Sequence, residues 1–138
     1  MREIDLWNIH VKPALNFGTR LAWKIGTSTR AGIPDVIYRN NGEVAFIEMK
    51  NLKPPKRATT NITLGLSIEQ RAHLREWGED GKGHAFVLAA IGRTVRLFPW
   101  YVPNVIQREN LEDVTLISIP LEVCKIDLGK RIDQVLRT

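Results

Sequence analysis

The stretch GIPDVIYRNNGEVAFIEMKN, residues 32–51, decides the fold, because it combines two apolar runs with a tight-turn signal between them. An Asn-Gly pair flanked by such runs is the strongest short signal for a β-hairpin. With Asn41 and Gly42 as a two-residue turn, Asp35 on the first strand faces Glu48 on the second. A three-residue loop with a bulge would shift this register by one residue, and the sequence leaves that alternative open.

The carboxylates of Asp35 and Glu48 would be direct cross-strand neighbours, about 5 Å apart at their β-carbons. Like charges at that distance repel, and the positions around them are largely apolar on both faces, as in the central strands of a sheet. A retained proton or a bound cation must compensate. Because carboxylate oxygens favour hard divalent ions, the sequence predicts a site for Mg²⁺ or Mn²⁺.

Lys50 lies two residues after Glu48 and therefore on the same face of the strand. There its ammonium group would stabilise charge on a phosphate or orient an attacking water. Together these side chains predict metal-assisted hydrolysis of a phosphodiester. The competing interpretation is structural. In it, Asp35 only ends a turn after Pro34, and Glu48 forms a solvated ion pair with Lys50 at a strand end.

The rest of the chain predicts an α/β fold, with a mixed central sheet flanked by helices. Helical spacing predicts helices over 2–16, 67–81 and 128–138. The apolar stripe of the first helix would be Ile4, Trp7, Val11, Ala14 and Leu15, and that of the second Ile68, Ala72, Leu74 or Arg75, and Trp77. Apolar runs predict further strands at 19–26, 84–92, 94–100 and 114–123. Segment 51–65, with two prolines and no period, predicts a long connection.

Length and composition bound the class of protein. The 138 residues suit one domain over 1–138, in which 101–138 is a C-terminal extension without an assigned role. The sequence contains no apolar run long enough for a membrane span and no signal peptide pattern, so we expect an intracellular, cytoplasmic protein. The single cysteine, Cys124, is expected to be a small apolar filler in a strand or buried edge. A net charge of +5 favours a polyanionic partner such as nucleic acid.

At these residues the sequence resembles the PD-(D/E)xK nuclease superfamily, with Pro34-Asp35 as the first motif and Glu48-Met49-Lys50 as the second. Within it the chain is most similar to the VRR-NUC family. In that family GIPD, a strand ending in E-x-K-N, and a helix opening with Ser-x-x-Gln follow in this order; here they occupy 32–35, 48–51 and 67–70. The likeness covers roughly the first 98 residues. It implies a restriction-endonuclease-like fold and a nuclease that uses Mg²⁺ or Mn²⁺.

The resemblance also implies roles for individual residues. Asp35, Glu48 and the backbone carbonyl of Met49 would hold the metal, and Lys50 would be the catalytic lysine. Gln70 would reach the same site from the following helix. The Ser-x-x-Gln pattern is equally a capping box, which satisfies helix-end amides without any catalysis, so the role of Gln70 stays open.

Two further groups extend the resemblance. Glu3 would be the acidic residue that such nucleases often carry on the first helix, or it is plain helix surface. The basic connection LKPPKRATTNITLG is longer than in the family. It would form a DNA-contacting arm, with Lys53, Lys56 and Arg57 against phosphates, or it is a solvated loop.

Stand-alone members of the VRR-NUC family, many of them viral or bacterial, resemble Holliday-junction resolvases that act as homodimers. The resemblance therefore implies a structure-specific DNA endonuclease that acts on branched DNA as a homodimer, whose two-fold axis would suit a four-way junction. Two alternatives stay open. One is a nicking, flap, restriction or repair-type endonuclease of the same fold. The other is a non-catalytic basic DNA-binding module whose acidic cluster is only structural.

Overall fold

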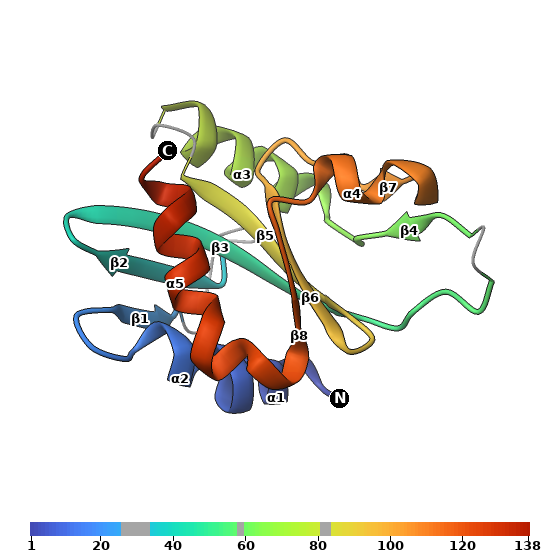
Figure 1. The fold of residues 1–138 in the computed structure, drawn as a ribbon. Coiled ribbons are helices and arrows are strands. Elements are labelled where there is room, and N and C mark those ends of the chain that lie inside the picture. The colour runs from blue at the N-terminus through green and yellow to red at the C-terminus, as the bar shows by residue number, and fades with distance from the viewer. Residues whose placement is uncertain (26–33, 58–59, 81–83) are drawn as a thin grey trace.

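A computed structural model describes residues 1–25, 34–57, 60–80 and 84–138 of the chain (Figure 1). Its centre is a six-stranded sheet in the order β1-β2-β3-β5-β6-β8. β3 and β5 are parallel, whereas every other neighbouring pair in this sheet is antiparallel. The strands are β1 (Leu21–Lys24), β2 (Val36–Asn40), β3 (Glu43–Leu52), β5 (Ala85–Ile91), β6 (Thr94–Pro99) and β8 (Ile117–Pro120). The predicted mixed sheet is confirmed.

β2 and β3 form the predicted hairpin. Asn41 and Gly42 have φ angles of 52° and 81°, and a type I′ turn requires positive φ at both of its central residues. Val36 pairs with Ile47, which is the predicted register, so the bulged alternative is wrong. Residues 32–33 of the same stretch lie outside the described residues.

Helices cover both faces of the sheet, and Figure 1 shows α5 lying across its strands. The short α1 (Glu3–Asp5) buries no residue, and one face of the sheet carries a π-helical segment (Leu6–Val11), α2 (Lys12–Leu15) and α5 (Cys124–Leu136). The other face carries α3 (Ile68–Asp80), α4 (Leu111–Val114) and a small sheet of β4 (Ile62–Thr63) and β7 (Val105–Ile106). β4 lies within the segment predicted as a connection. Among the described residues no helix is long and apolar enough to cross a membrane.

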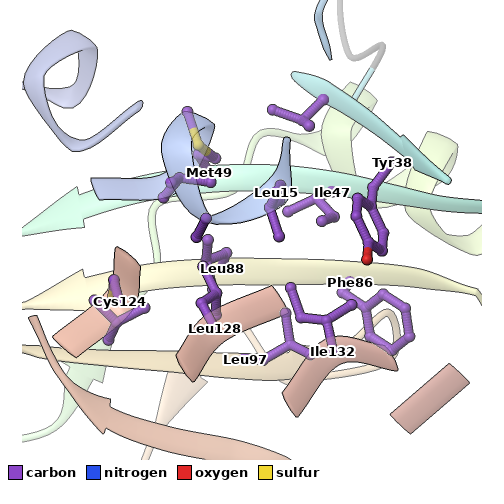
Figure 2. Close-up of a cluster of buried hydrophobic side chains, with 14 of the residues drawn as sticks. Leu15, Tyr38, Ile47, Met49, Phe86, Leu88, Leu97, Cys124, Leu128 and Ile132 are labelled. Carbon is purple, nitrogen blue, oxygen red and sulfur yellow. The ribbon is translucent and has the colours of Figure 1, made fainter. Parts of the chain in front are cut away.

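The larger core lies between the sheet and α5 (Figure 2). Alternate residues of the strands point into it, as the period of two in a strand requires. Tyr38 of β2, Met49 of β3 and Leu88 of β5 are 0% exposed there, and they pack with Leu128 and Ile132 of α5. The intervening residues of the same strands therefore face α3, and the candidate catalytic residues are among them.

The predicted N-terminal helix forms, but with a π-helical turn in its middle. Lys12 donates its N–H to the carbonyl of Trp7, five residues back, directly before Pro13. Pro13 has no N–H and could not donate an α-helical hydrogen bond in any case. The π-helical turn just before it therefore costs the helix no additional hydrogen bond. The wider turn also rotates the buried face, so that Leu6 is buried and Ile4 is 39% exposed. The predicted stripe is wrong at Ile4, whereas its other four positions are buried.

The apolar stripe predicted for α3 is largely wrong. Ile68 is 85% exposed and Ala72 is exposed, whereas Leu74 is buried. Gly78 lies directly against Trp100, and a β-carbon added there would overlap the indole ring. The contacts that α3 makes with the sheet and with residue 100 therefore set its orientation, and its own sequence pattern does not.

The last 38 residues, 101–138, complete the sheet and the core. β8 pairs with β6 at the sheet edge, and it ends at Pro120, which cannot donate to a ladder. α5 begins at Cys124, four residues before the predicted start at 128, so the strand predicted around Cys124 is wrong. Its thiol is nevertheless buried in the core, as expected for an apolar filler.

A buried polar cluster joins α5 to the sheet. The Asp133 carboxylate accepts hydrogen bonds from Arg20 Nε at 2.9 Å, from Asn40 Nδ2 at 3.0 Å and from the Tyr38 hydroxyl. Burial, and then the hydrogen bond to Asp133, raise the pKa of Tyr38. Gly129 leaves room for this arrangement, because an added β-carbon would lie 2.8 Å from Arg20 Cδ. Four side chains from three distant segments are thus fixed to one another.

Candidate active site

Asp35 and Glu48 come together on the α3 face of the sheet. Ile47 and Met49 point into the α5 core, so the residue between them points the other way. One step beyond the Val36–Ile47 pair, the same register puts Asp35 opposite Glu48. The structure therefore brings together the two carboxyl groups that the hairpin pattern predicted.

The Glu48 carboxyl is buried, with only 2% of the residue exposed. Burial raises the pKa of Glu48 to about 10, and Asp35 contributes next, by accepting a hydrogen bond from the protonated carboxyl and by repelling the ionised one. The positive charge of Lys50 lowers the pKa but does not offset these effects. Without a cation, Glu48 is therefore protonated at neutral pH, which makes a solvated ion pair at a strand end the wrong description of it.

Pro34 changes the hydrogen bonding of β3 beside this pair. In a two-residue hairpin every second pair exchanges two ladder bonds, and the alternation that includes Val36–Ile47 places Pro34 opposite Met49. Pro34 has no N–H, so the ladder supplies no donor to the Met49 carbonyl. The Met49 N–H donates instead to Asp35 Oδ2, at 2.9 Å. This effect of Pro34 was not predicted, although the absence of an N–H on proline is visible in the sequence.

Lys50 is held by two acceptors above the same face. Its Nζ donates to the Gly65 carbonyl at 3.1 Å and to Gln70 Oε1 at 3.2 Å. Gln70 Oε1 also accepts the Ser67 N–H at 2.9 Å, and the Gln70 N–H donates to Ser67 Oγ at 3.0 Å. Gln70 therefore closes a capping box and contacts Lys50 with one oxygen, so the two interpretations of Gln70 are compatible.

Glu3 approaches the same site from α1. The Asn51 side-chain amide donates to the Met1 carbonyl, which holds the N-terminal segment against the end of β3. Partial loss of solvent, and then the negative charge of Asp35, raise the pKa of Glu3, whereas Lys50 lowers it. Glu3 thus lies within the electrostatic reach of two residues of the candidate site.

The arrangement fits a divalent cation. Within the described ranges no three carboxylate, imidazole or thiol groups lie close enough together to hold an ion by themselves. Asp35 and Glu48 offer two carboxylates side by side, and Mg²⁺ is commonly bound through one or two carboxylates plus waters and substrate phosphates. A cation between them would favour ionised Glu48 and so reverse the shift of its pKa. The Met49 carbonyl, left without a ladder donor by Pro34, is a further oxygen ligand on the same strand.

Comparison with known proteins adds a likeness of fold. No protein-family model and no curated protein sequence matches the chain. Among the solved structures similar to it is Hjc from Archaeoglobus fulgidus, a Holliday junction resolvase from an archaeal hyperthermophile. The two are 16% identical, the alignment covers 94% of this chain and 92% of that chain, and the TM-score is 0.47. What the chain does is therefore inferred from the geometry of its own site.

The three residues predicted to contact DNA lie on the segment that follows β3. Lys53, Lys56 and Arg57 are all exposed. They follow Lys50 and Asn51 within seven residues of the sequence. Residues 58–59 of the same connection lie outside the described residues, and contact with DNA stays a prediction.

Proposed function

We propose that this chain is a metal-dependent nuclease that hydrolyses phosphodiester bonds in DNA, with the site of the PD-(D/E)xK superfamily. The observation that carries the proposal is the buried Glu48 carboxyl beside the Asp35 carboxylate, with Lys50 on the same face. Two acidic groups in such a place destabilise a fold unless a proton or a cation intervenes. A net charge of +5 suits a polyanionic substrate.

Each residue of the site has a separate task in this proposal. Asp35 and Glu48 would hold Mg²⁺ or Mn²⁺, together with the Met49 carbonyl, and Glu3 would act from the first helix. The ion, when bound, supplies Lewis acidity toward a phosphate oxygen and lowers the pKa of a bound water. Ionised Glu48 is needed for this, so loading of the site requires that Glu48 lose its proton.

In this proposal Lys50 would donate to the reacting group. An ammonium group has three N–H donors, and two of them point to the Gly65 carbonyl and to Gln70 Oε1. The third has no acceptor among the residues that the structure describes, and it would donate to a phosphate oxygen or to the attacking water. Gln70 is then a positioning residue, because it fixes the ammonium group relative to the two carboxylates.

The finer assignment concerns the substrate and the assembly. The order of motifs at 32–35, 48–51 and 67–70 favours the VRR-NUC family, and with it a homodimer that cuts branched DNA such as a Holliday junction. Lys53, Lys56 and Arg57 would bind phosphates beside the cut strand, without reading its sequence.

A panel of end-labelled DNAs tests the proposal. A four-way junction, a flap, a nicked duplex and an intact duplex are incubated with the chain in Mg²⁺, in Mn²⁺ and in EDTA. We expect cutting in either metal and none in EDTA, with the junction cut fastest. Faster cutting of the flap or the nicked duplex would favour the repair-type alternative. Binding without cutting in any metal would favour the non-catalytic module.

Two variants decide whether the named residues perform the chemistry. Glu48→Ala and Lys50→Ala are expected to abolish cutting and to leave DNA binding in EDTA largely intact. If cutting survives both substitutions, the assignment is wrong. Light scattering of the chain with and without junction DNA measures the number of copies in the complex, and a single copy would contradict the homodimer.

A further inference from the structure

An aromatic surface lies on the α3 face of the sheet at its β1 edge. Trp23 pairs with Ile37 across β1 and β2, and Ile37 pairs with Phe46 across β2 and β3. Residues that pair directly project their side chains to the same face. The ring of Trp77 in α3 stacks on Phe46, with centroids 4.4 Å apart and planes inclined by 24°. We refer to Trp23, Ile37, Phe46 and Trp77 as the aromatic platform.

The platform is open to solvent. Trp23 is 43% exposed and Trp77 is 41% exposed, whereas Trp7 is buried in the core. Leu21 and Val44 continue the apolar surface along the same face and are 42% and 41% exposed. Large apolar side chains gathered on one exposed patch mark a binding surface more often than single exposed ones do.

The platform adjoins the candidate active site. The Ile37–Phe46 pair is two residues along the strands from the Asp35–Glu48 position, which corresponds to about 7 Å on the same face. This is about two nucleotide steps of stacked DNA. A strand held at the carboxylates can therefore reach the platform within about two nucleotides, and a protein partner seated on the platform would obstruct a strand that takes this path.

The charge of this surface also favours a nucleic acid. Arg39 pairs with Leu21 and with Val44, so its guanidinium rises from the same face, and the residue is exposed. No acidic side chain belongs to the pairs that build the platform or to this neighbouring row. Exposed aromatic side chains beside a cation bind single-stranded nucleic acids, because the rings stack on unpaired bases and the cation attracts the phosphate backbone.

We propose that the aromatic platform binds unpaired nucleobases next to the scissile phosphate, with Trp23 and Trp77 stacking on the bases and Arg39 contacting a phosphate. This inference rests on the proposed nuclease function and narrows its substrate. The cut strand carries unpaired nucleotides beside the cut, as a flap or a single strand provides, and as a junction provides where base pairs at its branch point open. Since every base has a π-face, the platform selects structure and not sequence.

Two fluorescent oligonucleotides of equal length test the proposal without any cutting. One is a ten-residue oligothymidine, and the other is the same backbone with abasic sites. Binding is measured by anisotropy in EDTA, so the result does not depend on metal or on catalysis. We expect the wild-type chain to bind the oligothymidine about fivefold to a hundredfold more tightly than the abasic strand. Trp23→Ala and Trp77→Ala should each reduce this preference, and Trp23→Phe should retain part of it.

A matched control lies on the other flank of α3. Tyr101 is 64% exposed and packs edge-on against Trp100, beside Arg75, so Tyr101→Ala should keep the full preference for bases. Circular dichroism checks that each variant is folded. An equal affinity of the wild-type chain for both strands would overturn the proposal. So would a Trp23→Ala variant that keeps the preference while a dimer dissociates, because the platform would then be an interface between copies. If the chain prefers the strand with bases but cuts no DNA, base binding by the platform is supported and only the proposed nuclease activity is wrong.

Discussion

The Asp35 carboxylate accepts a hydrogen bond from the backbone N–H of Met49, at 2.9 Å. The bond crosses from the residue that precedes β2 to the middle of β3 and holds the Asp35 side chain beside Glu48. The extended register puts Pro34 opposite Met49, and because Pro34 has no N–H the Met49 carbonyl receives no ladder donor there. A motif of two residues, Pro34-Asp35, thus fixes one carboxylate and leaves one carbonyl without a ladder donor.

Replacing Pro34 tests that relationship. Pro34→Ala restores an N–H opposite the Met49 carbonyl, so we expect this carbonyl to be drawn into the ladder and Mn²⁺ binding to weaken about tenfold. Isothermal titration with Mn²⁺ measures the affinity. Pro103→Ala, at an exposed position, is the control and should leave the affinity unchanged. An unaltered affinity in Pro34→Ala would show that the carbonyl is not a ligand.

The raised pKa of Glu48 predicts how stability depends on pH. Its ordinary value is 4.5 and its value in the folded chain is about 10. Between these values the folded chain keeps a proton that the unfolded chain loses, so stability decreases as pH rises from about 5 to about 10. Urea unfolding in EDTA at pH 5, 7 and 9 measures this decrease. In Glu48→Gln, which cannot ionise, the decrease should be smaller, and identical slopes in both proteins would contradict the burial of this carboxyl.

The same proton predicts how metal binding depends on pH. A cation must displace the Glu48 proton, so its binding is favoured as pH rises. We expect 5 mM Mn²⁺, on the order of a saturating concentration, to raise the melting temperature by about 3 °C or more at pH 8 and by less at pH 6. Differential scanning fluorimetry measures the shift. Glu48→Gln should show no such shift, and a shift of equal size at both pH values would exclude Glu48 as a ligand.

Two matched substitutions separate the capping role of Gln70 from its contact with Lys50. Gln70→Ala removes both the cap and the contact with Lys50, whereas Ser67→Ala removes only a capping acceptor. Each should destabilise the chain by about 1 kcal/mol. Only Gln70→Ala should slow cutting, by roughly a hundredfold, because a misplaced catalytic group has effects of that size. Single-turnover cleavage, with the enzyme in saturating excess over the DNA, gives the rate. Equal rates in the two variants would leave Gln70 as a cap alone.

The polar cluster around Asp133 predicts a stability effect away from the site. Asp133→Ala leaves Arg20 charged and part-buried without its partner and removes the acceptor of two further side chains. We expect a loss of about 3–5 kcal/mol in the free energy of unfolding. Asp127→Ala, in the same helix, breaks a half-exposed pair with Arg131 and should cost less than about 0.5 kcal/mol. Urea denaturation compares the two, and similar losses would contradict the structural role of the cluster.

Local rules were sufficient for the hairpin and its carboxylate pair. The Asn41-Gly42 turn fixes the register, and the period of two along each strand then assigns Glu48 and Lys50 to one face and Met49 to the other. These features depend only on residues near one another in the chain. For that reason the sequence predicted them correctly without any knowledge of what covers the hairpin.

Local rules failed where the elements packed against a segment determine which of its residues are buried. The stripe of α3 was wrong because Gly78 meets Trp100 and Leu74 meets the sheet, and neither contact is visible in the helix alone. The prediction that Ile4 is buried was wrong because the π-helical turn before Pro13 rotates the buried face of the helix. The strand expected around Cys124 was wrong because α5 begins at this residue, four residues before the predicted start, and packs on the sheet.

By itself, then, the sequence determined the β2–β3 pairing and the chemical identity of the groups at its open end. The tertiary structure alone decided that Glu48 is buried and protonated, since β5 and α3 remove the water around it only after distant segments pack. It also decided that Gln70 touches Lys50 while capping its own helix, and that Trp23 and Trp77 stay exposed beside the site. Desolvation and contact between distant segments are properties of the packed molecule, and no local pattern encodes them.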